Sequence, residues 1–216
     1  MSCSLNLREV GYKSGEKTLF AAINLNVGHE EKVAIVGANG CGKSTLLRII
    51  AGVQEPSEGY LEIFHNKITD LKAFKIYRND IGYLPQDVTN HFLCPTVIED
   101  VMFSLRARGV NSDDAMQQAH EVLAQLGIEH LKERVIFELS GGEQKIVALA
   151  GLLVLEPKIL LLDEPTNALD EKSEKRIIEI LNGIKKSMVI VSHHKSFIEQ
   201  LTPTIYKLEN KILEPL

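Results

Sequence analysis

The chain has 216 residues, a formal net charge of −5 at pH 7 and a sequence pI of about 5.8. Apolar residues make up 44% and charged residues 25%, which is ordinary for a globular protein. This length suits one domain, or one domain with a subdomain, and a sizeable core. The acidic balance, without any prominent run of Lys or Arg, argues against a nucleic-acid partner.

The cysteines and the apolar runs argue against a disulfide-rich, a zinc-binding and a membrane-spanning protein. Cys3, Cys41 and Cys94 are odd in number and form no C-x-x-C pair, so they predict neither a disulfide framework nor a zinc site and favour a reducing compartment. The longest apolar run, 146–155, has ten residues, whereas a bilayer span needs about 20. We expect a soluble protein in which this run forms a helix buried on all sides, so any membrane role would come through a partner.

Strand patterns dominate the first 84 residues. Alternating apolar residues and short apolar runs, separated by turns at 13–16 and 56–59, predict β-structure. Pro85 ends the last of these runs. In chain order, the predicted strands cover 5–10, 19–27, 33–36, 60–64 and 81–84.

A glycine-rich loop follows the strand over 33–36. Its sequence, Gly37-Ala38-Asn39-Gly40-Cys41-Gly42-Lys43-Ser44-Thr45, fits G-x-x-x-x-G-K-[ST], the phosphate-binding loop. Glycines let the backbone wrap an anion, and the next helix, expected to end near 51–52, adds partial positive charge at its N-terminus. Lys43 would reach the β- and γ-phosphates and Ser44 would hold Mg²⁺. The alternative is a glycine-rich turn without a ligand.

Helical patterns replace strand patterns between residues 96 and 127. We predict helices over 96–107 and 113–126, because Asp113-Asp114 favours a helix start and Gly127 a helix end. This region therefore indicates a helical insertion.

From residue 140 onward, helices and strands alternate. Ser140-Gly141-Gly142 opens the apolar helix, which Pro157 ends, and 172–185 is an amphipathic helix. The β-α-β order predicts an α/β fold with a mostly parallel core sheet. The remaining predicted strands are 159–162, 188–191, and the closing hairpin of 204–208 and 211–213 through Glu209-Asn210.

Two carboxylates follow the apolar strand over 159–162. Asp163 and Glu164 would lie at the C-terminal edge of the sheet, where open α/β sheets bind ligands. Asp163 would reach Mg²⁺ through water, and Glu164 would polarise an attacking water as general base. Such carboxylates can alternatively cap helices or pair with lysine.

Leu139-Ser140-Gly141-Gly142-Glu143 marks a second helix N-terminus. The simple interpretation is that Ser140 caps this helix, with glycines in the turn. The free N–H groups of this terminus would also form a second anion site in the same chain.

These motifs, in this order and spacing, resemble the ATPase subunits of ABC transporters over essentially the whole chain. Residues 37–45 match the Walker A loop, 139–143 the signature and 159–164 Walker B. The resemblance implies a single domain over 1–216: a P-loop NTPase core, an N-terminal antiparallel β subdomain and a helical subdomain over about 87–155. It also implies a head-to-tail dimer, with each ATP between Walker A of one subunit and the signature of the other.

Further residues match the family one by one. Gln86 resembles the Q-loop glutamine, which contacts Mg²⁺ and the attacking water, although it could be an ordinary loop residue. Asp170 resembles the D-loop aspartate and could also be a helix N-cap. His193 resembles the switch histidine that contacts the γ-phosphate; the neighbouring His194 stands where the family commonly has Asp, and the His pair raises a metal alternative without an evident third ligand. Tyr12 resembles the aromatic residue that stacks on adenine, or is a core tyrosine.

The resemblance thus implies ATP and Mg²⁺ as ligands and three sets of site residues. Catalysis would depend on Lys43, Gln86, Glu164 and His193. Mg²⁺ would be held by Ser44, Gln86 and Asp163. The nucleotide would contact Tyr12, Gly37, Asn39, Gly40, Cys41, Gly42, Lys43, Ser44, Thr45, Ser140, Gly141, Gly142 and Asp170.

Two segments look like the cobalt/nickel and energy-coupling-factor importers. These are 87–100 and 148–153, where Gly151 follows Ala-x-Ala in the signature helix. We therefore predict an ATPase that drives import of a transition-metal ion or a vitamin from the cytoplasmic face of the cell membrane. Its partners would be a second ATPase subunit, identical or paralogous, and integral membrane transport subunits, with no nucleic acid.

Two alternatives belong to other classes. A soluble ABC ATPase acting on nucleic acid or ribosomes usually fuses two ATPase domains or carries a long coiled-coil insertion, and this chain has neither. A P-loop kinase or GTPase would not need the Leu-Ser-Gly-Gly-Glu motif, and no Asn-Lys-x-Asp guanine-reading motif is present.

Overall fold

A computed structural model describes residues 3–68 and 70–216, which form two compact units. Unit 1 comprises Met1–Tyr83, Lys158–Glu164 and Ile184–Leu216, and unit 2 comprises Leu84–Pro157 and Pro165–Gly183. Unit 2 contains the segment that we predicted as a helical subdomain and also takes in 165–183. The assignment of the whole chain to one ATPase domain stays a prediction.

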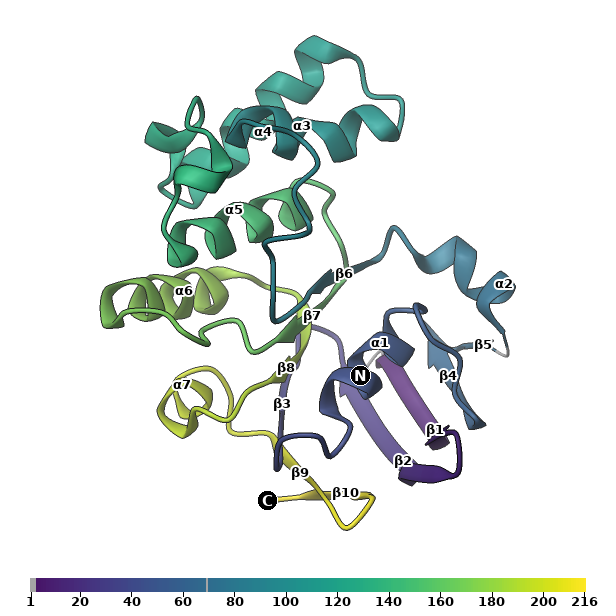
Figure 1. Cartoon of the computed structure of the whole chain (residues 1–216). Helices are drawn as coiled ribbons and strands as arrows, with labels where there is room; N and C mark the ends of the chain where they lie inside the picture. The colour runs from purple at the N-terminus through teal and green to yellow at the C-terminus, as the bar shows by residue number, and fades with distance from the viewer. Residues whose placement is uncertain (1–2, 69) are drawn as a thin grey trace. The chain divides into compact units, whose positions relative to one another are not determined.

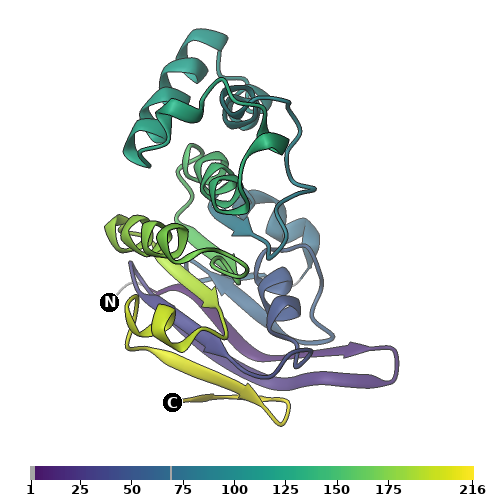
Figure 2. The same ribbon diagram turned by 60° about the vertical axis from the view of Figure 1, so that its left-hand side comes forward.

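Unit 1 begins with an antiparallel sheet whose strand order is β2-β1-β4-β5. In Figure 2, the first two strands form the long purple hairpin. Their alternating burial keeps one face in the apolar core and the other in solvent. The bounds are Cys3–Ser14 for β1, Lys17–Gly28 for β2, Glu58–Ile63 for β4 and Asn66–Ile68 for β5.

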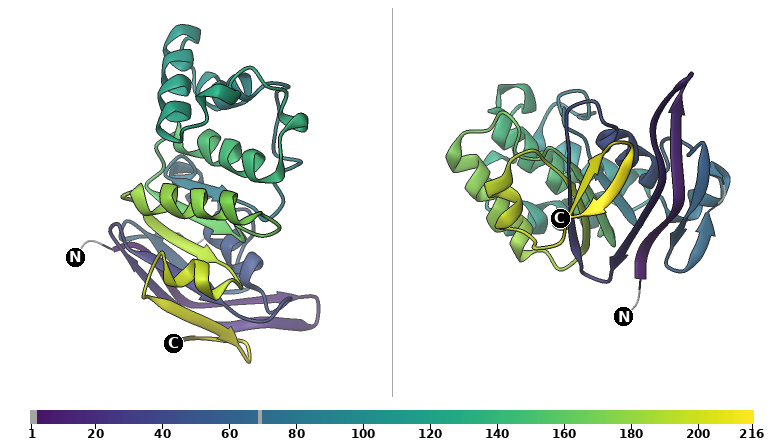
Figure 3. Two further views of the ribbon diagram at one scale, coloured as in Figure 1. Left: turned by 90° about the vertical axis from the view of Figure 1, so that its left-hand side faces the viewer. Right: turned by 90° about the horizontal axis from the view of Figure 1, so that it is seen from below.

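The second sheet has the order β10-β9-β3-β8-β7-β6, with parallel pairing from β9 through β3 and β8 to β7 (Figure 1). The β9–β10 hairpin is antiparallel, and Figure 3 shows it in yellow beside the purple strands. Every residue of β7 and β8 is buried, which explains their continuous apolar sequence. The bounds are Lys32–Val36 (β3), Ile81–Leu84 (β6), Ile159–Asp163 (β7), Ser187–Val191 (β8), Ile205–Glu209 (β9) and Ile212–Pro215 (β10).

One apolar core in unit 1 combines residues of both sheets with the helix α1. Leu46, Leu47 and Ile50 of this helix are fully buried, because they recur on the face that packs against the sheets. The helices of unit 1 are α1 (Lys43–Ile50), α2 (Leu71–Phe74) and α7 (Lys195–Glu199).

Unit 2 is helical. The helix α5 lies beside α6 and also contacts α3 and α4, as the three ribbon views agree (Figures 1–3). Side chains cap the N-termini: Thr96 with Glu99 at α3, and Asn111 at α4. The helices are α3 (Val97–Ala107), α4 (Ser112–Gln125), α5 (Gly141–Leu153) and α6 (Glu171–Gly183).

The predicted α/β class is confirmed, with its antiparallel N-terminal sheet and its mostly parallel core sheet. The predicted burial of the helix over 146–155 on all sides is wrong. The helix ends at Leu153, and Ala148 and 151–153 are half-buried, because one face of the helix packs while the other is partly open. The closing hairpin turns at Asn210-Lys211 instead of Glu209-Asn210, and both turn residues have left-handed φ values of 50° and 72°.

Besides the short 3-10 helices Lys75–Tyr77, Glu129–Leu131 and Ile136–Glu138, three short α-helices or strands of the described residues were not predicted. These are β5, α2 and α7, of three to five residues each, which are too short for a periodic pattern. Across the described residues, no helix combines the length and the apolar character that crossing a bilayer requires.

Candidate functional site

The loop between β3 and α1 places an open helix N-terminus at the edge of the parallel sheet. Its N-cap, Gly42, has φ 112°, a conformation that L side chains rarely adopt, and an added Cβ would also meet the Phe20 ring. Because the cap is glycine, it offers no side-chain oxygen to the first N–H groups of α1, and the first turn of this helix contains no acidic residue. The terminus therefore presents N–H groups and partial positive charge to an anion.

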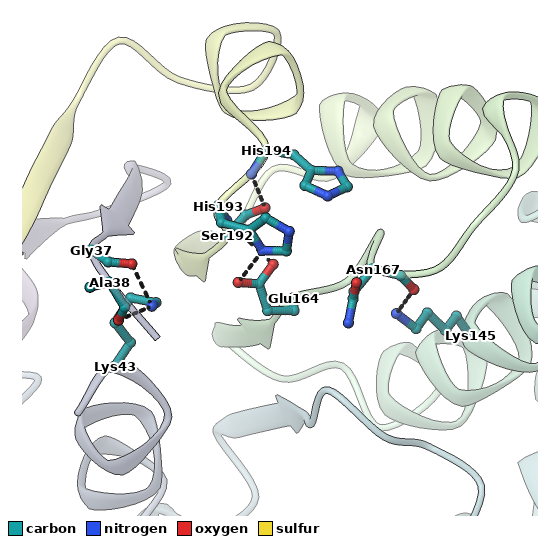
Figure 4. Close-up of polar contacts among 9 residues, drawn as sticks. All are labelled: Gly37, Ala38, Lys43, Lys145, Glu164, Asn167, Ser192, His193 and His194. Carbon is teal, nitrogen blue, oxygen red and sulfur yellow. Dashed lines mark hydrogen bonds and ion pairs between the residues drawn. The ribbon is translucent and has the colours of Figure 1, made fainter. Parts of the chain in front are cut away.

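Lys43 completes this cradle. Its side chain is buried, and Nζ donates to the carbonyl oxygens of Gly37 at 2.8 Å and Ala38 at 3.0 Å (Figure 4). The loop backbone thus holds the ammonium group within the loop. This arrangement fits a loop that binds phosphate through N–H groups and one lysine.

Asp163, at the end of β7, has a buried carboxylate and belongs to unit 1, as does the loop between β3 and α1. Its Oδ2 lies 3.5 Å from the Tyr83 hydroxyl, and its side chain also hydrogen-bonds Ser44. Burial raises the pKa of Asp163 above its ordinary value, and the nearby Glu164 carboxylate adds to this rise against the opposing effect of Ser44.

The other oxygen of Asp163 tests whether the site suits Mg²⁺. Asp163 Oδ1 is buried and has no hydrogen-bond partner among the described residues. A hard divalent cation would satisfy such an oxygen, and Ser44 offers a second oxygen ligand beside it. The donor set of Ser44 and Asp163 therefore fits Mg²⁺.

Glu164 and His193 form a close pair. His193 Nδ1 lies 2.8 Å from Glu164 Oε1, and the His193 backbone N–H donates to Oε2 at 3.4 Å (Figure 4). Glu164 is buried and has a left-handed φ of 48°, while its own N–H donates to Val191 O at 2.8 Å. The ends of β7 and β8 therefore orient this carboxylate, and the backbone of Glu164 is strained at a position that we predict to be catalytic.

The second predicted anion site lies in unit 2, at the N-terminus of α5. Ser140 Oγ accepts the Glu143 N–H at 3.3 Å, and Glu143 Oε2 accepts from the Ser140 N–H at 2.8 Å and its hydroxyl at 2.7 Å, which forms a capping box. Gly141 is exposed. Gly142 is buried, and an added Cβ would collide with the Ser173 hydroxyl. The glycine therefore allows α5 to approach α6 closely.

Asp170 caps α6, as its alternative interpretation predicted. Oδ1 accepts the N–H groups of Lys172 and Ser173, both at 3.0 Å, and Oδ2 accepts the Ser173 hydroxyl at 2.8 Å. The bond from the Ser173 N–H is the main reason that the pKa of Asp170 is lowered. A D-loop role for Asp170 remains compatible with this cap.

The other predicted site residues lie at several separate positions in the structure. Tyr12 is half-buried on β1, with its ring centroid 6.2 Å from that of Phe20. Gln86 is exposed in unit 2. His194 stacks edge-on against His193 at 4.3 Å, and no group of three potential metal-ligating side chains occurs in the described ranges, so the metal alternative gains no third ligand there. Of the remaining predicted residues, Asn39, Gly40 and Cys41 lie in the loop between β3 and α1, and Thr45 lies in the first turn of α1.

Sequence reasoning missed two polar contacts near these motifs. Tyr83 pairs with Asp163 across 80 residues, and Lys145 of α5 donates to the Asn167 carbonyl oxygen across 22 residues. For the second contact, the sequence offered one signal, which is a lysine, Lys145, on an otherwise apolar helix face. A buried lysine needs a hydrogen-bond partner, so its position predicts such a contact without naming the partner.

Comparison with known proteins identifies this set of motifs. Residues 20–167 match the family described as ABC transporter. The chain belongs to the ABC transporter ATPase family. It is 39% identical over 211 residues to a Brucella suis protein named as an ABC transporter ATP-binding protein, covering 98% of this chain and 88% of that one. A Haemophilus influenzae protein, also named as an ABC transporter ATP-binding protein, is 36% identical to this chain. The match covers 83% of this chain and 82% of the Haemophilus influenzae protein.

Solved structures of ABC transporter ATPases have the same fold as this chain. CbiO1 from Clostridium perfringens, described as part of the ABC transporter complex CbiONQ, superposes with a TM-score of 0.88 at 30% identity, over 99% of this chain and 87% of that one. A bacterial ABC transporter cassette described as dimeric gives 0.84 at 32% identity, over 97% and 96% of the two chains. The chain is therefore an ATP-binding subunit that hydrolyses ATP with Mg²⁺, as its family does.

The raised pKa of Asp163 predicts a sign for its effect on stability. A carboxyl group whose pKa is higher in the folded state contributes stability below its ordinary pKa of about 4 and loses it as the pH rises through the folded value. In the nucleotide-free ATPase, Asp163→Asn should therefore raise Tm at pH 7, with a gain that shrinks as the pH falls to 5. Thermal unfolding over this range measures it.

Asp170 provides the matched control, because its pKa is lowered. Its carboxylate contributes stability above the ordinary aspartate pKa and loses it as the pH falls. Asp170→Asn should therefore lower Tm at pH 7, opposite to Asp163→Asn. A lower Tm for both variants at pH 7 would contradict the burial argument for Asp163.

Proposed function

We propose that this ATPase works as one half of a head-to-tail dimer that drives import through integral membrane subunits, from the cytoplasmic face of the membrane. The observation that supports the dimer is that each chain has an open, glycine-capped helix terminus at α1 and a second helix terminus at Ser140, which keeps its side-chain cap and exposes Gly141. In the head-to-tail arrangement, the second terminus serves the ATP held by the partner. Similarity to an ABC transporter cassette that is described as dimeric, with 32% identity, supports a dimer.

The residues of unit 1 supply the chemistry of hydrolysis. Lys43 and the N–H groups of the loop bind the phosphates of ATP, which places the γ-phosphate at the edge of the sheet. Glu164 accepts a proton from the attacking water and orients it, while His193 holds the Glu164 carboxylate and contacts the γ-phosphate. Mg²⁺, held by Ser44 and Asp163, would offset the phosphate charge.

Lys43→Ala tests phosphate binding. Removing the ammonium group deletes charge-assisted hydrogen bonds worth about 1.5–3 kcal/mol each, so ATP affinity should fall roughly 10- to 150-fold. Equilibrium titration with a fluorescent ATP analogue measures this change. The exposed Lys72→Ala is the charge-matched control. Unchanged affinity in Lys43→Ala would remove Lys43 from the phosphate site.

Glu164→Gln tests the general base. The amide keeps the shape of the side chain but accepts no proton, so kcat should fall by about 10²–10⁴ while ATP affinity is kept. The variant should also accumulate as an ATP-bound dimer in size-exclusion chromatography. Glu199→Gln, on the exposed face of α7, is the control. Normal turnover in Glu164→Gln would exclude the proposed role.

An exposed apolar surface in unit 2 supports a membrane partner. Leu93 and Phe137 are 69% and 65% exposed, and Val135 is also exposed. The segment before α3 and the segment before α5 run together, since Ile136 N–H donates to Pro95 O at 2.9 Å and Thr96 pairs with Val135. We assign this surface, defined by Leu93, Val135 and Phe137, to an apolar segment of the membrane subunit.

Phe137→Asp tests the docking surface. A charge in an apolar interface should abolish co-purification with the membrane subunits from detergent extracts. ATPase activity of the isolated subunit should stay within about twofold, because Phe137 is exposed and outside the nucleotide site. Leu216→Asp, also an exposed leucine, is the control. Full recovery of the complex with Phe137→Asp would place the partner elsewhere.

The nature of the cargo is proposed from the family branch. Residues 87–100 and 148–153 resemble the cobalt/nickel and energy-coupling-factor importers, and the structural similarity to CbiO1 at 30% identity supports this branch. We therefore propose a transition-metal ion or a vitamin as cargo, bound by the membrane partners. Identifying the integral protein that co-purifies with the ATPase tests the assignment.

A further inference from the structure

The helix α5 carries a buried lysine that hydrolysis, as described above, does not use. Lys145 is 6% exposed and shares the packed face of α5 with Ile146 and Leu149. Its Nζ donates to the backbone carbonyl oxygen of Asn167 at 2.9 Å (Figure 4). Burying an ammonium group is unfavourable unless it is hydrogen-bonded, so this contact fixes where the acceptor lies.

Asn167 belongs to a short loop that carries strain. The loop 165–170 joins Glu164 to α6. Glu164, just before the loop, and Ala168, within it, are non-glycine residues with left-handed φ values of 48° and 61°. Only Pro165 and Thr166 separate Asn167 from Glu164. Such a conformation persists only where neighbouring groups hold it, and Lys145 is one of those groups.

A second contact joins the same two elements. Gly142 approaches Ser173 so closely that a Cβ would collide with its hydroxyl, and that hydroxyl donates to Asp170 at the end of the loop. The helix α5 thus contacts loop 165–170 through Lys145 and the start of α6 through Gly142. These two contacts connect the signature helix to the loop and to the helix that follows it.

The charge of Lys145 also reaches the segment after Gln86. The pKa of Asp87 is lowered chiefly by its hydrogen bonds with Thr89, and Lys145 contributes a smaller electrostatic effect in the same direction. Lys145 therefore acts on the segments that follow two predicted catalytic residues, electrostatically on the one after Gln86 and by a hydrogen bond on the one after Glu164.

We propose that Lys145 is a positioning residue that couples the two ATP sites of the dimer. The inference rests on the proposed head-to-tail dimer. In that dimer, the signature of each chain closes on the partner's ATP, whereas Glu164 acts on the chain's own ATP. Within one chain, Lys145 ties the signature helix to the loop that follows Glu164. Closure on the partner's nucleotide is thereby transmitted to the chain's own catalytic carboxylate.

Lys145→Met tests this coupling, because methionine fills the same space without a donor. The dependence of ATPase rate on ATP concentration should change from sigmoidal, with a Hill coefficient near 2, to hyperbolic, and kcat should fall about tenfold. ATP affinity of the monomer, measured at dilution, should stay within twofold. Lys145→Arg retains a donor and should restore the Hill coefficient and most of kcat.

Lys175→Met is the control, since it removes a positive charge from an exposed pair with Glu171 on α6. If Lys145→Met fails to fold by circular dichroism, Lys145→Gln takes its place, because its shorter neutral side chain also weakens the contact. A folded variant with wild-type cooperativity and kcat would overturn the role of Lys145 alone. If the wild-type enzyme neither dimerises with ATP nor shows cooperativity, the dimer mechanism itself fails.

Discussion

The chain must hold two carboxylates at the end of a strand that is buried at every position. The strand β7 lies within the parallel part of the core sheet, so water is excluded from its length, and Asp163 and Glu164 meet solvent only at its C-terminal end. The cost of burying Asp163 appears in its raised pKa and in an oxygen, Oδ1, that finds no hydrogen-bond partner within 3–68 and 70–216. A site that is unfavourable for a free carboxylate is favourable for a bound cation.

The three helix N-termini near the functional motifs are capped in different ways. Ser140 with Glu143, and Asp170, cap α5 and α6 with side-chain oxygens, which satisfy N–H groups internally. Gly42 at α1 offers no such oxygen. The main phosphate cradle is therefore the terminus that the chain leaves open, whereas the signature terminus keeps its cap and still exposes Gly141 toward solvent.

In the proposed mechanism, both catalysis and coupling between the two ATP sites depend on the short loop after β7. Glu164 is held from one side by the end of β8 and by His193, and the loop beyond it is held by Lys145. In the proposed dimer, the Glu164 carboxylate acts on the ATP bound by its own chain. Its position also depends, through the signature helix, on the ATP bound by the partner. A strained loop suits this role, because it keeps its functional geometry only while its supports are in place.

The sequence alone determined the local features of this protein. Residues 37–45, the cap at Ser140 and the apolar strand before Asp163 are each encoded by neighbours within a few positions, because turns, caps and strand burial follow from local spacing. Tertiary structure alone decided the partners of Asp163 and Lys145, which lie 80 and 22 residues away, and which face of α5 is packed. Such contacts arise only when separate segments fold together, so no local pattern specifies them.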